Sequence, residues 1–232
     1  MNFFEWFSNN FEQTFLKDNR YKLFLEGFQN TLITAFAATF IGIIIGVVIA
    51  VVKVMHKKTG KLKILNAVFE IYTTVIRGTP VVLQLLISYN LIFAFSSNAV
   101  LIAVLSFGIN SGAYVSEIIR AGIMAVDVGQ TEAGRSLGLS QGQTMRLIVL
   151  PQALKNVLPA LGNELIALLK ETSVVGYLGV RDLTKAANSV TALTLDFYFP
   201  YITIAIIYLV LVYGLQLIFN MLERRFAQSD RG

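Results

Sequence analysis

Among the polar and charged side chains in residues 151–176, four are the clearest candidates for chemistry in this sequence. They are Asn163, Glu164, Lys170 and Glu171. In a helix, residues seven apart share one stripe, so Glu164 and Glu171 fall together and Asn163 and Lys170 form the adjacent stripe. A charged side chain within a membrane costs about 2.5–3.5 kcal/mol, so it tends to face a cavity or a partner. The spacing therefore predicts one polar face on this helix.

Glu164 follows Pro151 by 13 residues, which is about 20 Å along a helix and near the middle of a bilayer core about 30 Å thick. Two interpretations remain open. Either Glu164 binds a cationic group of a polar solute, with Asn163 contacting an amide or carboxylate, or it pairs with a basic residue of a neighbouring helix. For Lys170 and Glu171, a structural or gating role is favoured.

Other kinds of chemistry find little support. The chain contains no cysteine, so it has no disulfide, thiol nucleophile or cysteine-based metal site. Its one histidine, His56, lies among lysines and is expected to be a solvated loop residue. No G-x-x-x-x-G-K-[ST] loop occurs, so we expect no cofactor in this chain and no binding of ATP or Mg²⁺ by it.

The elements that position these residues are predicted to be membrane helices. The chain is 55% hydrophobic and 14% charged, against about 25% charged residues in soluble domains. A bilayer core needs about 20 apolar residues per helix, and Pro80 should kink the second span. The prediction is an all-α bundle with five spans, at residues 27–52, 62–95, 100–119, 151–176 and 197–222.

Basic residues indicate the orientation, because lysine and arginine gather in cytoplasmic loops. Twelve of the 19 basic residues fall in the loop Lys53–Lys63, after the third span and in the C-terminal tail. The N-terminus is therefore expected outside and the C-terminus inside. This distribution accounts for the net charge of +5 without a nucleic-acid partner.

Residues 1–26 are predicted to form an extracytoplasmic amphipathic segment. Aromatic residues recur every three or four positions, at Phe4, Phe7, Phe11 and Phe15, which is typical of a helix in the membrane interface. A tether that packs on the first span is the alternative.

The segment 121–150 is a polar insert on the predicted cytoplasmic side. Asp127 with Gln130 and Ser140 with Gln143 fit two N-caps, and Gly138 fits a helix end between them. Leu150-Pro151 is expected to redirect the chain into the fourth span. The sequence predicts a rigid helix–turn–helix that fits a concave docking site on another protein.

This insert resembles the EAA loop of ABC importer permeases, usually E-A-A, three residues, G, nine residues, I-x-L-P. The matching residues are Glu132, Ala133, Gly138, Ile148, Leu150 and Pro151, within residues 127–151. Gly134 replaces the second alanine, which should loosen the helix by up to about 1 kcal/mol. The stretches EIYTTVIRGTP (70–80), INSGAYVSEIIRAGI (109–123) and PALGNELIALLKETS (159–173) are similar to the polar amino acid branch. The resemblance covers residues 27–226.

The resemblance implies a permease subunit in a bacterial cytoplasmic membrane. It implies a second permease subunit, two ABC ATPase subunits that use ATP and Mg²⁺ and receive the EAA loops, and an extracytoplasmic amino-acid-binding protein. The solute would be a polar amino acid, with a glutamine-like one favoured. Candidate substrate-binding residues are Asn163, Glu164, Lys170 and Arg77, although Arg77 could instead neutralise Glu70; Glu117 and Arg120 are expected to form a structural pair.

An ion-coupled secondary amino acid transporter is the rival interpretation. Such transporters often contain inverted repeats with broken helices at the membrane midplane. No convincing repeat is found in this sequence, which favours the ABC importer.

Overall fold

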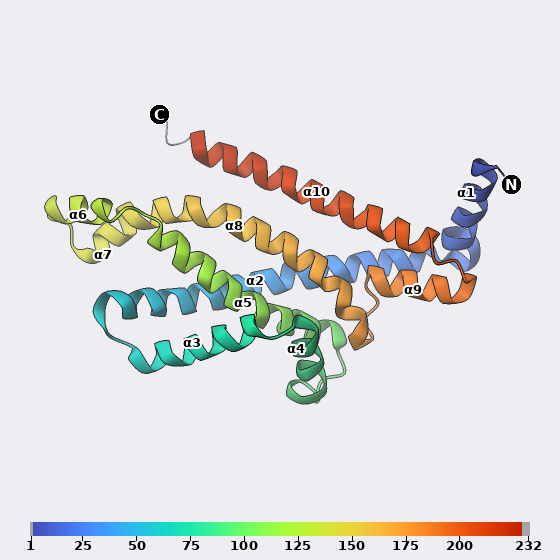
Figure 1. The fold of residues 1–232 in the computed structure, drawn as a ribbon, viewed down its shortest axis with the longest axis horizontal. Helices are drawn as coiled ribbons and strands as arrows, with labels where there is room; N and C mark the ends of the chain where they lie inside the picture. Colours follow the sequence, from blue (N-terminus) through green and yellow to red (C-terminus); the bar gives the residue numbers. More distant parts are fainter. Residues whose placement is uncertain (1, 229–232) are drawn as a thin grey trace.

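The structure, a computed structural model, describes residues 2–228 as an elongated helical bundle without strands in that range (Figure 1). Its α-helices are α1 (Phe3–Phe11), α2 (Tyr21–Thr59), α3 (Lys63–Gly78), α4 (Val81–Ile87), α5 (Ala99–Met124), α6 (Val128–Ser136), α7 (Gln141–Thr144), α8 (Leu150–Glu171), α9 (Leu183–Thr194) and α10 (Phe199–Gln228). Short π or 3₁₀ segments cover Glu12–Leu16, Lys17–Asn19, Ser88–Ile92, Met145–Val149 and Thr172–Leu178. The predicted all-α class is confirmed.

Helices α2 and α5 form the centre of the bundle by close backbone contact. The small residues Ala38, Gly42, Gly46 and Ala50 are all buried, so the row is a packing face. A Cβ atom at Gly42 would lie 2.7 Å from the Ser111 Oγ on α5. Glycines on α5 approach α2 in the same way. The two helices therefore hold the polar residues of α5 at a fixed depth in the bundle.

Gly46→Ala is expected to destabilise this contact. The added Cβ would lie 2.5 Å from the Val115 Cγ1 and 2.9 Å from the Ser116 backbone nitrogen, and overpacking of this kind costs about 1–3 kcal/mol. Gly214→Ala on α10 is the matched control, because nothing lies within 4 Å of its Cβ position; it should be neutral or stabilising. Thermal unfolding in detergent compares the two. Equal stability of both variants would contradict the packing described here.

The second predicted span is broken more sharply than a kink. Helix α3 ends at Gly78, α4 begins at Val81, and the axes of Lys63–Gly78 and Val81–Ile92 differ by 112°. Pro80 lies at the N-cap of α4 and cannot continue α3. Figure 1 shows α4 turning away from the long axis of the bundle. The predicted bend at Pro80 is therefore present, as a break between two helices that is sharper than a kink.

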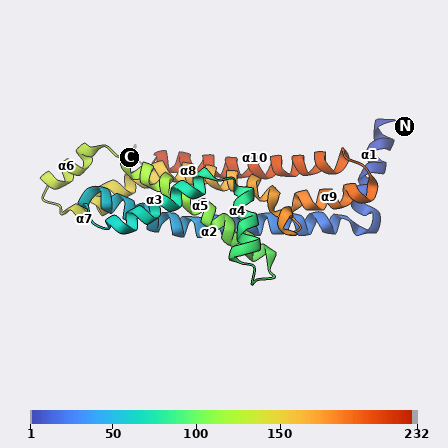
Figure 2. The same cartoon turned by 60° about the horizontal axis from the view of Figure 1, so that its bottom comes forward.

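Three helices of the described residues are long and apolar enough to cross a membrane, namely α2, α5 and α10, and the bent pair would make a fourth. Helix α8 is not among them, because polar residues interrupt its apolar sequence, yet it runs along α2 and α10 (Figures 1 and 2). The count of five spans stays a prediction.

Helix α2 is longer than the span predicted from its uncharged residues. It continues through the expected Lys53–Lys63 loop to Thr59, so Lys53 and His56 are helical residues and that part of the loop prediction was wrong. Lysine is a good helix former, and a charge ends the apolar stretch without ending the helix. Lys53 is also buried, with 4% of its surface exposed.

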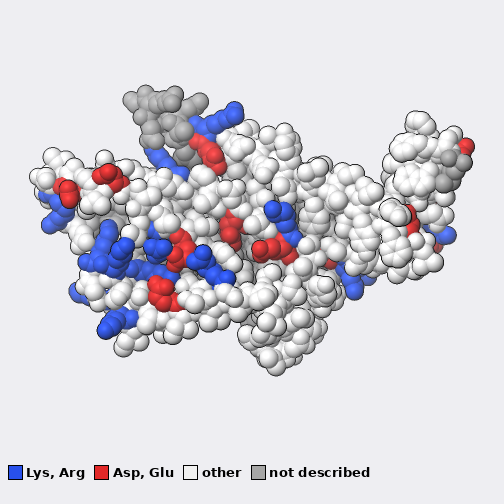
Figure 3. Space-filling view, viewed as in Figure 1, with Lys and Arg blue, Asp and Glu red and all other residues white. Residues whose placement is uncertain are grey.

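The two ends of the bundle differ in charge. The α2–α3 turn, helices α6 and α7 and the C-terminal end of α10 lie at one end, and α1 and α9 lie at the other (Figures 1 and 2). Lysine and arginine gather at the first end over α2 and α3 (Figure 3). The basic segments of the described residues therefore lie at one end of the bundle, and their side of the membrane stays a prediction.

The N-terminal segment contains an amphipathic helix, as its aromatic spacing predicts. Helix α1 begins with a capping box between Asn2 and Glu5. The rings of Trp6 and Phe7 contact Phe199 at centroid distances of 5.9 and 5.5 Å. Helix α1 therefore packs on the start of α10 rather than on the first span alone.

Asp182 makes folding sensitive to pH at the α9 end. It is the N-cap of α9, is 1% exposed, and accepts a hydrogen bond from the Lys185 backbone N–H at 2.8 Å. Burial raises the pKa of the Asp182 carboxyl from 3.8 to about 6. The folded chain thus binds this proton more tightly than the unfolded chain, so stability is lost as the pH rises from about 4 through about 6.

Asp182→Asn is therefore expected to gain stability relative to the unmodified chain between pH 5 and pH 7.5, by up to about 3 kcal/mol. Asparagine keeps the capping interaction. Thermal unfolding across this pH range measures the difference, with Glu12→Gln at an exposed position as control. A difference that does not change with pH would refute the role of the buried carboxyl.

Candidate functional site

Three consecutive residues of α5 bring three other helices together in the middle of the bundle. The Tyr72 hydroxyl of α3 donates to the Ile109 carbonyl. The Asn110 amide donates to Gln84 Oε1 of α4 at 2.8 Å. The Ser111 hydroxyl donates to Glu164 Oε1 of α8 at 3.0 Å. These contacts place a cluster of polar groups within helices that are otherwise apolar.

The Glu164 carboxylate is held at this cluster by a hydrogen bond from a neutral group, the Ser111 hydroxyl. Its side chain is half-buried, whereas Ser111 is fully buried. Among the residues that the structure describes, no lysine or arginine forms an ion pair with Glu164. The basic partner that one interpretation required is thus not found in this part of the chain. One carboxylate oxygen remains open to a further hydrogen-bond donor.

Arg77 approaches the same side of α5. Its guanidinium lies over the Tyr114 ring, 5.4 Å from the centroid, and cation–π contacts of this geometry are favourable. Tyr114 is three residues after Ser111, so both occupy neighbouring positions on one helix face. Arg77 does not neutralise Glu70, which pairs with Lys53 instead; that alternative was wrong.

Asn163 and Lys170 lie on α8 without a contact to the cluster. Both are exposed, and neither side chain forms a hydrogen bond within the described residues. The structure therefore brings Glu164 and Arg77 to α5, but leaves Asn163 and Lys170 on the open surface of α8. No group of three or more histidine or acidic residues that could hold a metal ion occurs in residues 2–228.

Gln84 fixes the turn at Pro80 beside this cluster. Its amide donates to the Ile76 carbonyl at 2.7 Å and to the Thr79 hydroxyl at 2.8 Å, while its oxygen accepts from Asn110. Gln84 thereby ties the end of α3 to α5. Gln84, Asn110 and Ser111 were not among the predicted site residues, although polar residues in an apolar span are a usable signal.

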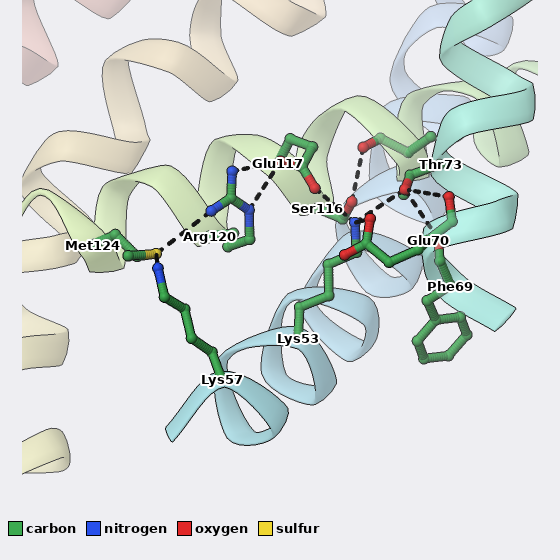
Figure 4. Close-up of polar contacts among 10 residues, drawn as sticks. Lys53, Lys57, Phe69, Glu70, Thr73, Ser116, Glu117, Arg120 and Met124 are labelled. Carbon is green, nitrogen blue, oxygen red and sulfur yellow. Dashed lines mark hydrogen bonds and ion pairs between the residues drawn. The ribbon is translucent and has the colours of Figure 1, made fainter. Parts of the chain in front are cut away.

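An ion network centred on the buried Lys53 joins α2, α3 and α5 towards the basic end of the bundle (Figure 4). Lys53 Nζ lies 2.7 Å from Glu117 Oε1 and 3.3 Å from Glu70 Oε2, and donates to the Thr73 hydroxyl at 2.9 Å. Arg120 pairs with Glu117 at 2.8 Å, as its spacing predicts. Because Lys53 is buried, its charge depends on these partners, and the network ties the three helices to one another.

The polar insert forms the predicted helix–turn–helix. The Asp127 carboxylate accepts from the Gly129 N–H at 2.6 Å, and Ser140 and Gln143 form a capping box. Gly138 has a φ of +82°, which only glycine adopts readily, and ends α6. The N-cap at Asp127, the capping box at Ser140 and the helix end at Gly138 are confirmed, whereas Gln130 accepts from the Gln152 amide instead of closing a box with Asp127.

The junction with α8 differs from the prediction. A π-helical turn at Met145–Val149 joins α7 to α8, and the backbone stays helical from Gln141 to Glu171. Leu150-Pro151 therefore does not redirect the chain by a break. Pro151 lacks an N–H, but near the start of α8 this costs little. A continuous run of helical residues, with the π turn and Pro159 within it, joins the insert to Glu164.

The residues of the insert divide into a buried and an exposed set. Gly134 is buried, and a Cβ there would lie 2.8 Å from both Thr144 Cγ2 and Ile148 Cδ1. Glycine thus lets α6 pack on the following helix, which is a reason for its replacing alanine. Ile148 is half-buried, whereas the surface-exposed residues are Glu132, Ala133, Gly138, Leu150 and Pro151.

The family described as "Binding-protein-dependent transport system inner membrane component" matches residues 42–228. The chain belongs to this family. It is thus a permease subunit of an ABC importer, located in a membrane, and the family's ATPase activity lies in separate subunits. The family implies ATPase partners, a substrate-binding protein and a second permease subunit. The rival secondary transporter has no support.

Named relatives resemble this permease over nearly its whole length. The arginine transport system permease protein of Bacillus subtilis is 40% identical over 209 residues, covering 89% of this chain and 93% of the relative. A putative glutamine transport system permease protein of Rickettsia bellii is 40% identical, covering 74% and 80%. A crystal structure of an amino acid ABC transporter with histidines is 43% identical, covers 91% and 98%, and has a TM-score of 0.83.

Proposed function

We propose that this permease moves a polar amino acid inward, and that the solute contacts Glu164 during its passage. The observation that carries the proposal is the Ser111–Glu164 hydrogen bond in the middle of the bundle. It holds a carboxylate without a cationic partner in the described chain, so an ammonium group would complete it. The amino acids named for relatives, arginine and glutamine, support a polar solute. A glutamine-like solute is favoured.

The other candidate residues suit the remaining groups of an amino acid. A guanidinium binds a carboxylate with two parallel hydrogen bonds, and Arg77 lies on the same face of α5 as Ser111. Asn163 directly precedes Glu164 in the chain and offers both a donor and an acceptor. Lys170, exposed on α8, would meet the solute before or after it reaches Glu164.

We propose further that the insert docks on an ATPase subunit and moves when that subunit hydrolyses ATP. Glu132 and Ala133 are exposed on α6, where the socket of an ATPase subunit would contact them. Gly138, Ile148, Leu150 and Pro151 shape the turn and the connection to α8. The helical stretch from Gln141 to Glu164 is about 35 Å long. Movement of the insert would therefore shift Glu164 without bending a loop.

The orientation and the span count belong to the same proposal. With the insert on the cytoplasmic side, the N-terminus and residues 1–26 lie outside and the C-terminus lies inside, in a bacterial cytoplasmic membrane. Helices α2, α5, α8 and α10 and the bent pair α3–α4 would then supply five crossings. Closing of the ATPase subunits would rock α8 against α5 and expose Glu164 to alternate sides.

Uptake in proteoliposomes tests this proposal. The permease is reconstituted with its ATPase and binding protein, and glutamine, arginine, histidine and leucine are offered with ATP inside or with an ion gradient alone. We expect ATP-dependent uptake of a polar amino acid and none from the gradient. Gradient-driven uptake without the ATPase, or uptake of leucine alone, would refute the proposal.

A further inference from the structure

A groove of about 310 Å³ lies between the C-terminal ends of α2 and α5 and the start of α6. We call it the basic groove. Its lining includes the basic residues Lys57, Lys58 and Arg120 and the apolar residues Val54, Ile123 and Met124. Figure 3 shows lysine and arginine gathered over this end of the bundle. The groove therefore combines positive charge with an apolar surface.

Two cationic side chains in the groove, Lys57 and Arg120, both contact the sulfur atom of Met124. Lys57 Nζ lies 3.3 Å and Arg120 Nη1 lies 3.4 Å from the sulfur of Met124 (Figure 4). A thioether is a weak acceptor, and two positive charges brought this close repel each other. An anion between them would remove both costs. The geometry thus favours an anionic group beside Met124.

Carboxylates of this region are already engaged with other groups. Glu117 accepts from Lys53 and from Nε of Arg120, and Glu70 pairs with Lys53. Lys57 forms no ion pair within the described part of the chain. The anion that fits between Lys57 and Arg120 must therefore come from outside that part of the chain.

The depth of the groove indicates what kind of anion this is. Residues 27–52 of α2 carry no charge and suffice to cross a bilayer core. Lys53 is the first charge after them, and Lys57 follows one turn later. The groove therefore lies at the level of lipid headgroups, where basic pockets between membrane helices bind anionic headgroups. A free phosphate would leave the apolar wall unused.

We propose that the basic groove binds an anionic phospholipid. Its phosphate lies between Lys57, Lys58 and Arg120, in contact range of the groups that now face the Met124 sulfur. The upper parts of the acyl chains contact Val54 and Ile123, which are half-buried in the apolar wall. The site requires α2 and α5 to cross the membrane, and does not depend on the transported solute or on the ATPase.

Lipid binding to the full-length chain tests the proposal. Delipidated protein in detergent is titrated with phosphatidylglycerol, phosphatidylcholine or inorganic phosphate, and retained lipid is measured by native mass spectrometry beside the thermal unfolding midpoint. We expect phosphatidylglycerol alone to be retained and to raise the midpoint. Lys57→Gln combined with Lys58→Gln should lower retention roughly 30-fold, at about 1 kcal/mol for each lysine.

Two control variants distinguish a loss of lipid binding in the groove from a general effect of charge or of folding. Lys61→Gln with Lys63→Gln removes the same charge outside the groove and should retain the lipid. Met124→Trp fills the groove without changing charge and should lower retention, even if the lysine variant folds poorly. Equal retention of phosphatidylcholine, an equal loss in both lysine pairs, or full stabilisation by inorganic phosphate would each overturn the proposal.

Discussion

Glu132→Lys is expected to abolish binding of the ATPase subunit and, with it, ATP-driven uptake. Glu132 is exposed on α6, and its side chain forms no hydrogen bond or ion pair within residues 2–225. Its replacement should therefore leave the bundle folded. Reversal of an interface charge costs about 2–5 kcal/mol, which weakens binding roughly 30-fold or more. Co-purification of the ATPase with the tagged permease measures this loss.

The matched control for this variant is Glu12→Lys. It makes the same charge change at an exposed position at the opposite end of the bundle and should leave ATPase binding intact. Glu132→Gln removes the charge without reversing it and should give an intermediate loss. Normal ATPase recovery with Glu132→Lys would remove the coupling role proposed for the insert.

Glu164→Gln is expected to reduce uptake by about 10- to 150-fold. Glutamine keeps an oxygen that can accept from the Ser111 hydroxyl, so the contact between α5 and α8 should survive. The variant loses the negative charge that an ammonium group would meet, and a hydrogen bond to a charged group is worth about 1.5–3 kcal/mol. Initial uptake rates, with amounts of assembled complex matched, measure the effect.

Glu171→Gln separates this effect from a general loss of charge on α8. Glu171 lies on the same stripe but is exposed at the end of the helix, so its variant should retain most uptake. Ser111→Ala should impair uptake less than Glu164→Gln, because it removes a positioning group. Equal uptake by Glu164→Gln and the unmodified permease, with an unstable complex, would assign Glu164 to structure.

The features that the sequence predicted correctly depend on near neighbours. The caps at Asp127 and Ser140, and the helix end at Gly138, are set by residues within one turn. The small-residue row of α2 follows from helical spacing alone. Local backbone chemistry leaves few alternatives at such positions, so sequence patterns predict them well.

Contacts between distant segments could not be predicted in the same way. Lys53 and Glu117 are 64 residues apart, and Ser111 and Glu164 are 53 apart; which polar residues meet depends on how the helices cross. The length of α2 was underestimated because a run of uncharged residues indicates only the part of a helix that lies in the membrane core. Helical propensity, which is high for lysine, decides where the helix itself ends. The break at Pro80 depends likewise on Gln84 and Asn110.

Accessibility of a single cysteine tests the central claim, that the insert lies in the cytoplasm and docks on a separate ATPase. The sequence has no cysteine, so Ala133→Cys on α6 and Tyr198→Cys at the opposite end each provide one unique thiol, both at exposed positions. A membrane-impermeant maleimide is added to right-side-out and inside-out vesicles. We predict labelling of Ala133→Cys only in inside-out vesicles, and protection once the ATPase is bound; Tyr198→Cys should show the reverse sidedness and no protection. Labelling of Ala133→Cys from the outside, or equal labelling with and without the ATPase, would contradict the account.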